Sequence, residues 1–85
     1  MTPDELVPLY GFVHGDTLGL LVLVRSSDTV AKLAATLEEA ARVRVAPLLN
    51  PRVVHAGKRL EPGLTVAAAG LSALARVELV PEAGP

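Results

Sequence analysis

The sequence contains no cysteine, no tryptophan and no isoleucine, and it has only one tyrosine and one phenylalanine. Without cysteine the chain can form no disulfide, no thiolate nucleophile and no cysteine-ligated zinc site, which is typical of a reducing compartment. Leucine, alanine and valine supply almost all of the hydrophobic residues, which make up 51% of the 85 residues. The sequence therefore predicts a single domain with an aliphatic core.

An excess of charge and a long hydrophobic run are also missing. Eight basic and nine acidic residues give a net charge of −1, whereas nucleic-acid binding requires basic patches that neutralise phosphates. The longest apolar run, Leu18 to Val24, is far shorter than the roughly 20 residues of a membrane-spanning helix. The first residues are acidic where a secretory signal is basic. We therefore expect a cytoplasmic protein that binds neither nucleic acid nor membrane.

Groups able to support catalysis or metal binding are sparse. His14 and His55 fall in different predicted segments, and no cysteine or third histidine completes a metal site. The carboxylates have local roles in turns, helix caps and solvated faces, so no pair for acid–base catalysis stands out. Ser26 and Ser27 are better placed as caps than as nucleophiles, and the glycines match no phosphate-binding motif. We predict no catalytic, cofactor-binding or metal-binding residue in this chain.

The first half of the chain predicts a hairpin followed by a helix. Strands over Val7 to Val13 and Leu18 to Val24 flank a short polar turn, which is typical of an antiparallel hairpin. The run Ser26 to Thr29 consists of residues favoured at helix N-caps, and from Val30 the apolar residues recur at helical spacing. We expect the helix to end around Arg42 to Arg44.

Two further features of this helix can be predicted. Glu38 and Arg42 have the i,i+4 spacing of an ion pair on its surface. Pro47 and Pro51 prevent the helix from continuing beyond its expected end.

The second half predicts short strands over Arg52 to His55, Arg59 to Leu60 and Arg76 to Val80. Between them, Thr65 to Ala69 is expected to form one helical turn that Thr65 caps and Gly70 ends. This order of elements predicts an α+β fold of the β-grasp type, in which a mixed sheet of four or five strands packs on one helix. The first and last strands then lie side by side. We expect one domain over residues 1–85, with flexible termini at 1–5 and 81–85.

The second predicted strand is apolar on both of its faces. Leu20, Val22 and Val24 share one parity and are expected to face the helix, but Leu21 and Leu23 occupy the other parity. A sheet with a helix on one face normally has a polar opposite face.

An exposed apolar surface on a small protein typically marks a protein–protein interface. We predict such an interface at Tyr10, Leu21, Leu23, Val54 and Val80, with Leu9 replacing Tyr10 if the parity of the first strand is reversed. The alternative is that a small domain of this composition leaves some aliphatic side chains exposed.

Part of the chain resembles ubiquitin. The shared pattern comprises Ser27-Asp28-Thr29 at the start of the helix, Arg52, Ala56-Gly57-Lys58, Leu60-Glu61, Gly63, Thr65 and the closing run Val77 to Val80. This resemblance implies, as an alternative function, a protein modifier that is activated at a C-terminal glycine. Gly84 is the candidate glycine, and it requires removal of Pro85.

Nearly the whole chain resembles the small gamma (B) subunit of bacterial toluene/o-xylene-type diiron monooxygenases. The shared pattern comprises Val7-Pro8-Leu9, Asp16, Leu21-Val22 with Val24, Asp28-Thr29, Arg44-Val45-Ala46-Pro47, Arg52-Val53 and the run from Leu60 to Leu71. The chain departs from this pattern at Thr17, where the family usually has an aromatic residue.

The second resemblance implies a non-catalytic accessory subunit. Its partner would be the large hydroxylase subunit, which carries two irons and the pocket for an aromatic or alkene substrate. The chain itself would hold no cofactor and would bind through its sheet. A further alternative is a free-standing interaction module, like the ubiquitin-like proteins linked to type VII secretion.

Overall fold

A computed structural model describes residues 4–82 of the chain. Its elements are β1 (Leu6–Val13), β2 (Gly19–Arg25), α1 (Val30–Ala41), β3 (Pro51–His55), β4 (Lys58–Arg59) and β5 (Arg76–Pro81). The strand bounds agree with the sequence-based predictions to within one residue at each end. The described residues therefore confirm the predicted order of elements.

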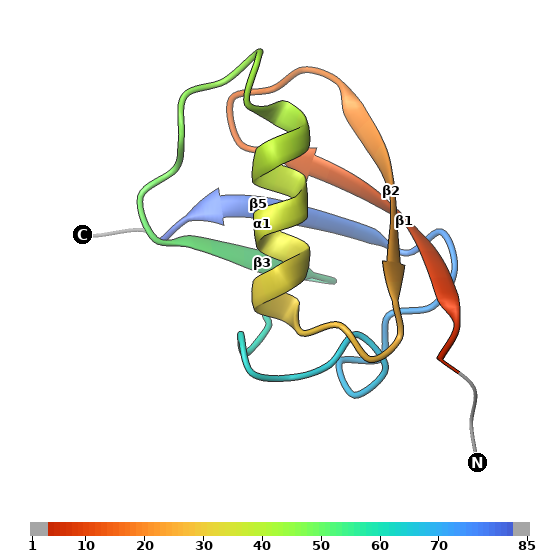
Figure 1. The fold of residues 1–85 in the computed structure, drawn as a ribbon. Coiled ribbons are helices and arrows are strands. Elements are labelled where there is room, and N and C mark those ends of the chain that lie inside the picture. Colours follow the sequence, from red (N-terminus) through yellow and green to blue (C-terminus); the bar gives the residue numbers. More distant parts are fainter. Residues whose placement is uncertain (1–3, 83–85) are drawn as a thin grey trace.

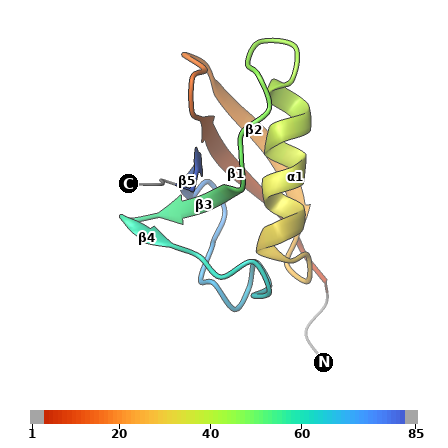
Figure 2. The same cartoon turned by 90° about the vertical axis from the view of Figure 1, so that its left-hand side faces the viewer.

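The strands form one mixed sheet in the order β2-β1-β5-β3-β4. β1 pairs antiparallel with β2 and parallel with β5, and β3 pairs antiparallel with both β5 and β4. Helix α1 crosses one face of this sheet and leaves the opposite face uncovered (Figures 1 and 2). The predicted β-grasp arrangement is confirmed, including the side-by-side placement of the first and last strands.

The core lies between α1 and the inner face of the sheet, and it is aliphatic as predicted. The side chains at its centre are less than 2% exposed: Leu9, Leu33, Leu37, Leu79, Val30, Val53, Val66 and Val77. Gly11 allows the helix to approach β1 closely, because a Cβ atom at this position would overlap Cδ2 of Leu37. The absence of a side chain at Gly11 therefore helps to set the distance between the helix and the sheet.

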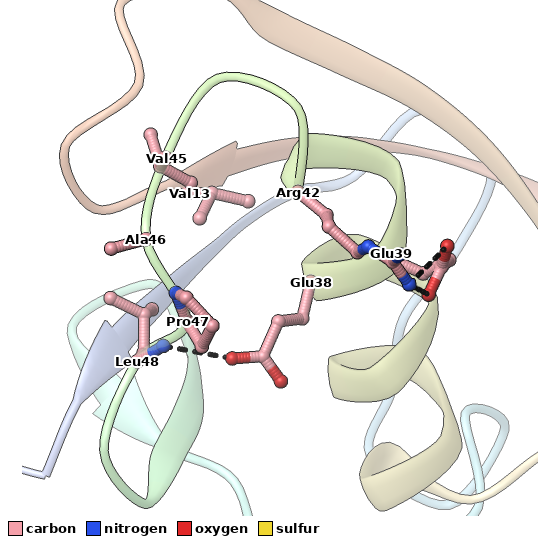
Figure 3. Close-up of a pocket in the computed structure, with 8 residues that line it drawn as sticks. All are labelled: Val13, Glu38, Glu39, Arg42, Val45, Ala46, Pro47 and Leu48. Carbon is pink, nitrogen blue, oxygen red and sulfur yellow. Dashed lines mark hydrogen bonds and ion pairs between the residues drawn. The ribbon is translucent and has the colours of Figure 1, made fainter.

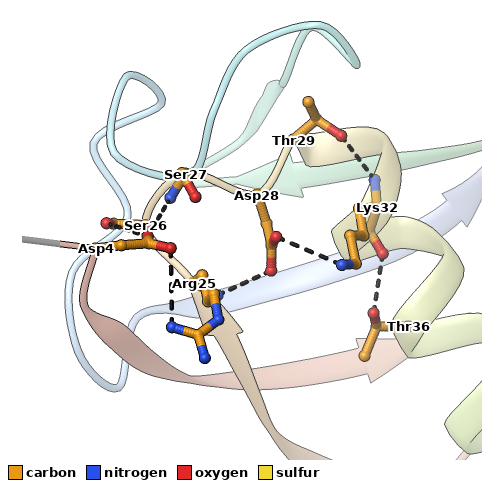
Figure 4. A network of polar contacts seen from close by, with 8 residues as sticks. All are labelled: Asp4, Arg25, Ser26, Ser27, Asp28, Thr29, Lys32 and Thr36. Atoms are coloured by element: carbon orange, nitrogen blue, oxygen red, sulfur yellow. Dashed lines mark hydrogen bonds and ion pairs between the residues drawn. The ribbon is translucent and has the colours of Figure 1, made fainter.

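A polar network holds the start of α1 against the hairpin (Figure 4). Thr29 is the N-cap, and its Oγ1 accepts a hydrogen bond of 3.1 Å from the backbone N–H of Lys32. Asp4 accepts hydrogen bonds from the hydroxyl of Ser26 and the backbone N–H of Ser27. Of the predicted capping residues Ser26 to Thr29, only Thr29 thus caps the helix. The two serines instead bind the residues that precede β1.

The ordered part of the chain extends further toward both ends than expected. Besides the hydrogen bonds of Asp4, the backbone N–H of Glu5 donates to the hydroxyl of Ser26. At the other end Pro81 belongs to β5, and Glu82 accepts a 2.9 Å hydrogen bond from the guanidinium of Arg52. Of the predicted flexible termini, residues 4, 5, 81 and 82 therefore have defined contacts, and the others lie outside the described residues.

The predicted ion pair between Glu38 and Arg42 is wrong. The Glu38 carboxylate accepts a 2.9 Å hydrogen bond from the backbone N–H of Leu48, while Arg42 turns toward Glu39 at 3.2 Å (Figure 3). The backbone N–H of Leu48 is partly buried, and buried donors are normally paired with an acceptor, here the Glu38 carboxylate. Because Glu38 forms this hydrogen bond with the loop, its carboxylate does not pair with Arg42.

The segment after Thr65 forms a single hydrogen-bonded turn. The hydroxyl of Thr65 accepts from the backbone N–H of Ala68, and its carbonyl accepts from Ala69. The turn ends at Gly70, whose φ of +78° is the left-handed conformation that favours glycine. The predicted single helical turn is therefore confirmed, together with its cap and its end residue.

Candidate interaction surface

The β1–β2 hairpin places apolar side chains on the outer face of the sheet, which is the face turned away from α1. Leu21 and Leu23 are 60% and 62% exposed, whereas Val22 and Val24 between and beyond them are buried. This alternation follows from the two-residue period of a strand. The predicted parity of the second strand is therefore confirmed.

The register of the hairpin gathers these leucines with residues of β1. Tyr10 lies directly opposite Leu21, and Pro8 lies opposite Leu23. Tyr10 and Leu6, which are 45% and 59% exposed, also point to the outer face because buried Leu9 has the other parity. We call Leu6, Tyr10, Leu21 and Leu23 the outer patch.

Two predicted interface residues lie apart from the outer patch. Val54 in β3 and Val80 in β5 are half-buried and belong to the outer face. However, Glu78 of β5 lies between Phe12 and Val54 in the register, and Val80 lies opposite Arg52. The outer face is therefore apolar over β1 and β2 and mainly charged over β5 and β3. Sequence parity identified the face but not this division.

An aromatic ring and a guanidinium mark the border between these two halves. The guanidinium carbon of Arg76 lies 4.2 Å from the centroid of the Phe12 ring, a cation–π contact. Gly19 opposite Phe12 makes room for the ring, because a Cβ atom there would come within 3.0 Å of it. Phe12 of β1 and Arg76 of β5 thus meet where the apolar and the charged halves of the outer face adjoin.

A buried carboxylate anchors the end of the hairpin opposite to the helix N-terminus. The Asp16 side chain is 2% exposed and receives two hydrogen bonds to its Oδ2 from the guanidinium of Arg44, at 2.8 and 3.0 Å. The guanidinium, together with the backbone N–H of Leu18, holds the pKa of Asp16 below its ordinary value. Sequence reasoning assigned Asp16 only a turn role, because a partner 28 residues away leaves no local signal.

The residues considered for chemistry do not come together. His14 lies in the hairpin turn, and Nδ1 of His55 lies 2.9 Å from the carbonyl oxygen of Arg76. Within residues 4–82 no three histidine, cysteine or acidic side chains are close enough to hold a metal ion. Gly84, the candidate conjugation residue, lies outside the described residues.

Two concave sites flank the helix, but both are small. One of about 180 Å³ lies between the end of α1 and the loop that follows, lined by Val13, Glu38, Glu39, Arg42, Val45, Ala46, Pro47 and Leu48 (Figure 3). The other, of about 210 Å³, lies between α1 and β3. Ligand pockets usually measure roughly 300–1,000 Å³, so the outer patch is the stronger candidate site. Over residues 4–82 there is also no helix with the length and apolar character needed to cross a membrane.

The fold has clear relatives among solved structures. A chain of the toluene 4-monooxygenase HD complex with the inhibitor 4-bromobenzoate superposes with a TM-score of 0.85 at 24% identity, over 92% of this chain and 100% of that one. Ubiquitin of Caldiarchaeum subterraneum superposes with a TM-score of 0.75 at 14% identity, over 94% and 98% of the two chains. A designed protein based on ubiquitin gives 0.75 at 22% identity, over 94% and 93%. No curated protein sequence matches the chain.

These superpositions, and the packing of helix α1 on a mixed sheet within residues 4–82, define a ubiquitin-like β-grasp fold. The family described as toluene-4-monooxygenase system protein B (TmoB) matches residues 6–80, which is most of the chain. The protein belongs to this family, as its resemblance to the small subunit of such monooxygenases predicted.

Proposed function

We propose that this protein is a non-catalytic accessory subunit of a multicomponent diiron monooxygenase that oxidises an aromatic or alkene substrate. It binds the large hydroxylase subunit through the outer face of its sheet, in the cytoplasm. The two irons and the substrate pocket belong to that partner. The family membership supports the assignment to such a system, and the outer patch supports a role in binding protein.

The outer patch is the observation that carries the proposal. Its four side chains are between 45% and 62% exposed, although an aliphatic core is already complete on the other face of the sheet. Burial of apolar surface stabilises a complex by about 25 cal/mol per Å², before the costs of association. Because the patch combines adjacent leucines and a tyrosine, it has the composition of an interface core rather than of scattered surface residues.

Co-purification tests the proposal directly. The chain is expressed together with the components of a diiron hydroxylase from the same organism, and the complex is isolated through a tag on the large subunit. We expect the wild-type chain to co-elute with the large subunit, and Leu21→Asp and Leu23→Asp each to abolish co-elution. Both variants should keep the fold, because these side chains face away from the core.

Val43→Asp is the matched control for these variants. Val43 is 89% exposed and directly follows α1, which packs on the face of the sheet opposite to the outer patch (Figure 2). The control introduces the same charge at an exposed aliphatic residue and should leave co-elution unchanged. A wild-type chain that binds no diiron protein would contradict the proposal, as would equal loss of binding in the control.

A further inference from the structure

The two edge strands of the sheet differ in their protection against strand pairing. β4 is one edge, and it consists only of Lys58 and Arg59, both exposed. Short length and charged side chains are features that keep sheet edges from pairing with other chains. β2 is the other edge; it has seven residues, and its only charged residue is Arg25 at its end. By these criteria β4 is a protected edge and β2 is not.

The register shows which backbone groups of β2 face outward from the sheet. The carbonyl of Pro8 accepts from Leu74, and the N–H of Tyr10 donates to Ala75, so these residues of β1 direct their backbone groups toward β5. The residues of β1 that bind β2 are therefore the alternate ones, beginning with Glu5, whose carbonyl accepts from the N–H of Ser26.

The same alternation applies along β2. The partners of Val7, Leu9 and Gly11 in the register are Val24, Val22 and Leu20, which therefore direct their backbone groups toward β1. Leu21 and Leu23 then direct their N–H and C=O groups toward the open edge. These are also the residues whose side chains form half of the outer patch.

The protein itself closes one end of this open stretch. Near that end the backbone N–H of Arg25 donates to Oδ2 of Asp28 at 2.9 Å. Toward the other end the backbone groups of Gly19 also face the open edge, because Gly19 has the same parity as Leu21 and Leu23. Among residues 4–82, no hydrogen bond to the backbone of Gly19, Leu21 or Leu23 comes from a loop, a cap or a side chain. The unpaired backbone groups are thus confined to a short stretch beside the patch.

We propose that an extended segment of the partner protein adds a strand to the β2 edge and pairs with the backbone of Leu21 and Leu23. The inference rests on the proposed function and specifies the kind of contact that the partner makes. Only another extended main chain can supply donors and acceptors at the spacing of a strand, and added strands bind in this way in other recognition modules. Side chains of the segment that point to the outer face would contact Leu21 and Leu23, so we expect them to be apolar.

Proline substitution tests the backbone contact. Leu23→Pro removes the edge-facing N–H, and proline is tolerated in edge strands when its nitrogen faces away from the sheet. Leu23→Ala is the matched variant, because it also loses the leucine side chain but keeps the N–H. We expect the proline variant to bind the hydroxylase at least about tenfold more weakly than the alanine variant, because the partner's carbonyl is left without a donor.

Amide hydrogen exchange in the wild-type complex gives a second readout that needs no variant. In the free protein the amides of Leu21 and Leu23 should exchange much faster than that of Val22, which is bound to β1. In the complex we expect both leucine amides to slow by at least about tenfold. Protection of the Val22 amide in Leu23→Pro would show that this variant is folded. If the variant does not fold, the exchange rates of Leu21 and Leu23 in the wild-type complex test the inference instead.

Several results would overturn the inference. Equal binding by Leu23→Pro and Leu23→Ala, or leucine amides that stay unprotected in the complex, would exclude strand addition while leaving the proposed function intact. Protection of the same amides in a dimer of the chain alone that persists beside the hydroxylase would identify a second copy as the occupant. Failure of the wild-type chain to bind the hydroxylase would overturn the proposed function and this inference together.

Discussion

The carboxylate of Asp16 joins the turn between β1 and β2 to the loop that follows α1. Its pKa is lowered, first by the hydrogen bonds from Arg44 and then by the N–H of Leu18. A carboxyl group whose pKa is lower in the folded state stabilises the fold above its unfolded pKa, here near 3.8, and that contribution is lost as the pH falls through the folded value. The pair therefore stabilises the protein at neutral pH.

Replacement of this carboxylate should consequently have a pH-dependent effect. We expect Asp16→Asn to lower the midpoint of thermal unfolding at neutral pH, and the difference from wild type to shrink as the pH falls below about 3.8. Thermal melts followed by circular dichroism over a pH series measure this. Glu39→Gln is the control, because Glu39 pairs with Arg42 on an exposed surface where ion pairs contribute little. A constant difference at all pH values would show that the charge of Asp16 is not the cause.

Gly11 provides a second prediction at the scale of one residue. Gly11→Ala should lower the free energy of unfolding by about 1–3 kcal/mol, because the new methyl group overlaps the Leu37 side chain in a packed core. Gly63→Ala is the control, since a Cβ atom there has no neighbour within 4 Å.

Urea denaturation of the single variants and of Gly11→Ala combined with Leu37→Ala tests the cause. The double variant should be more stable than the sum of its parts predicts, because removal of the Leu37 side chain relieves the overlap. Simple additivity of the two substitutions would contradict this explanation.

At the level of single residues, the sequence predicted roles that depend on neighbours in the chain. Thr29 as a cap and Gly70 as a turn end are local features, and both are confirmed. The Glu38–Arg42 pair was wrong because the competing donor, the N–H of Leu48, is ten residues away. The bond between Asp16 and Arg44 could not be predicted for the same reason, since it requires the loop after α1 to fold back onto the hairpin.

At the scale of elements, the start of α1 depends on its cap. We expect Thr29→Ala to lower the free energy of unfolding by about 1 kcal/mol, because the N–H of Lys32 loses its acceptor. Thr36→Ala is the matched control within the same helix. The Thr36 hydroxyl donates to the backbone carbonyl of Lys32, and this side-chain hydrogen bond is not needed to form the helix. Chemical denaturation of both variants measures the difference, and equal destabilisation would argue against a capping role.

The strands and the helix were predictable because each has a strong periodic pattern and clear end signals. The apolar residues of α1 recur on one face, and β2 has leucine and valine at every position between Gly19 and Arg25. The parity of β2 was also predictable, since only one parity can face the helix. Which backbone groups remain unpaired could not be predicted, because that depends on the order of the strands in the sheet and on their register.

The molecule as a whole is asymmetric across its sheet. At the β2 side the edge is long and aliphatic and adjoins the outer patch, whereas at the β4 side the edge is short and basic. The charged residues of β5 and β3 lie between these two sides on the outer face. Val54 and Val80 were predicted as part of one continuous surface because parity alone says nothing of the charged neighbours that separate them from the hairpin.

This asymmetry predicts that a partner binds one end of the sheet and leaves the other free. Leu23→Ala should weaken the complex with the hydroxylase by about tenfold or more, mainly through faster dissociation, because an apolar contact at the centre of the interface is lost. Lys58→Ala combined with Arg59→Ala should change the affinity for the hydroxylase by less than about twofold, since β4 lies outside an interface formed at the β2 side. Surface plasmon resonance with immobilised hydroxylase measures both rates. A large loss of affinity in the β4 variant would move the interface to the charged half of the face, where Val54 and Val80 lie.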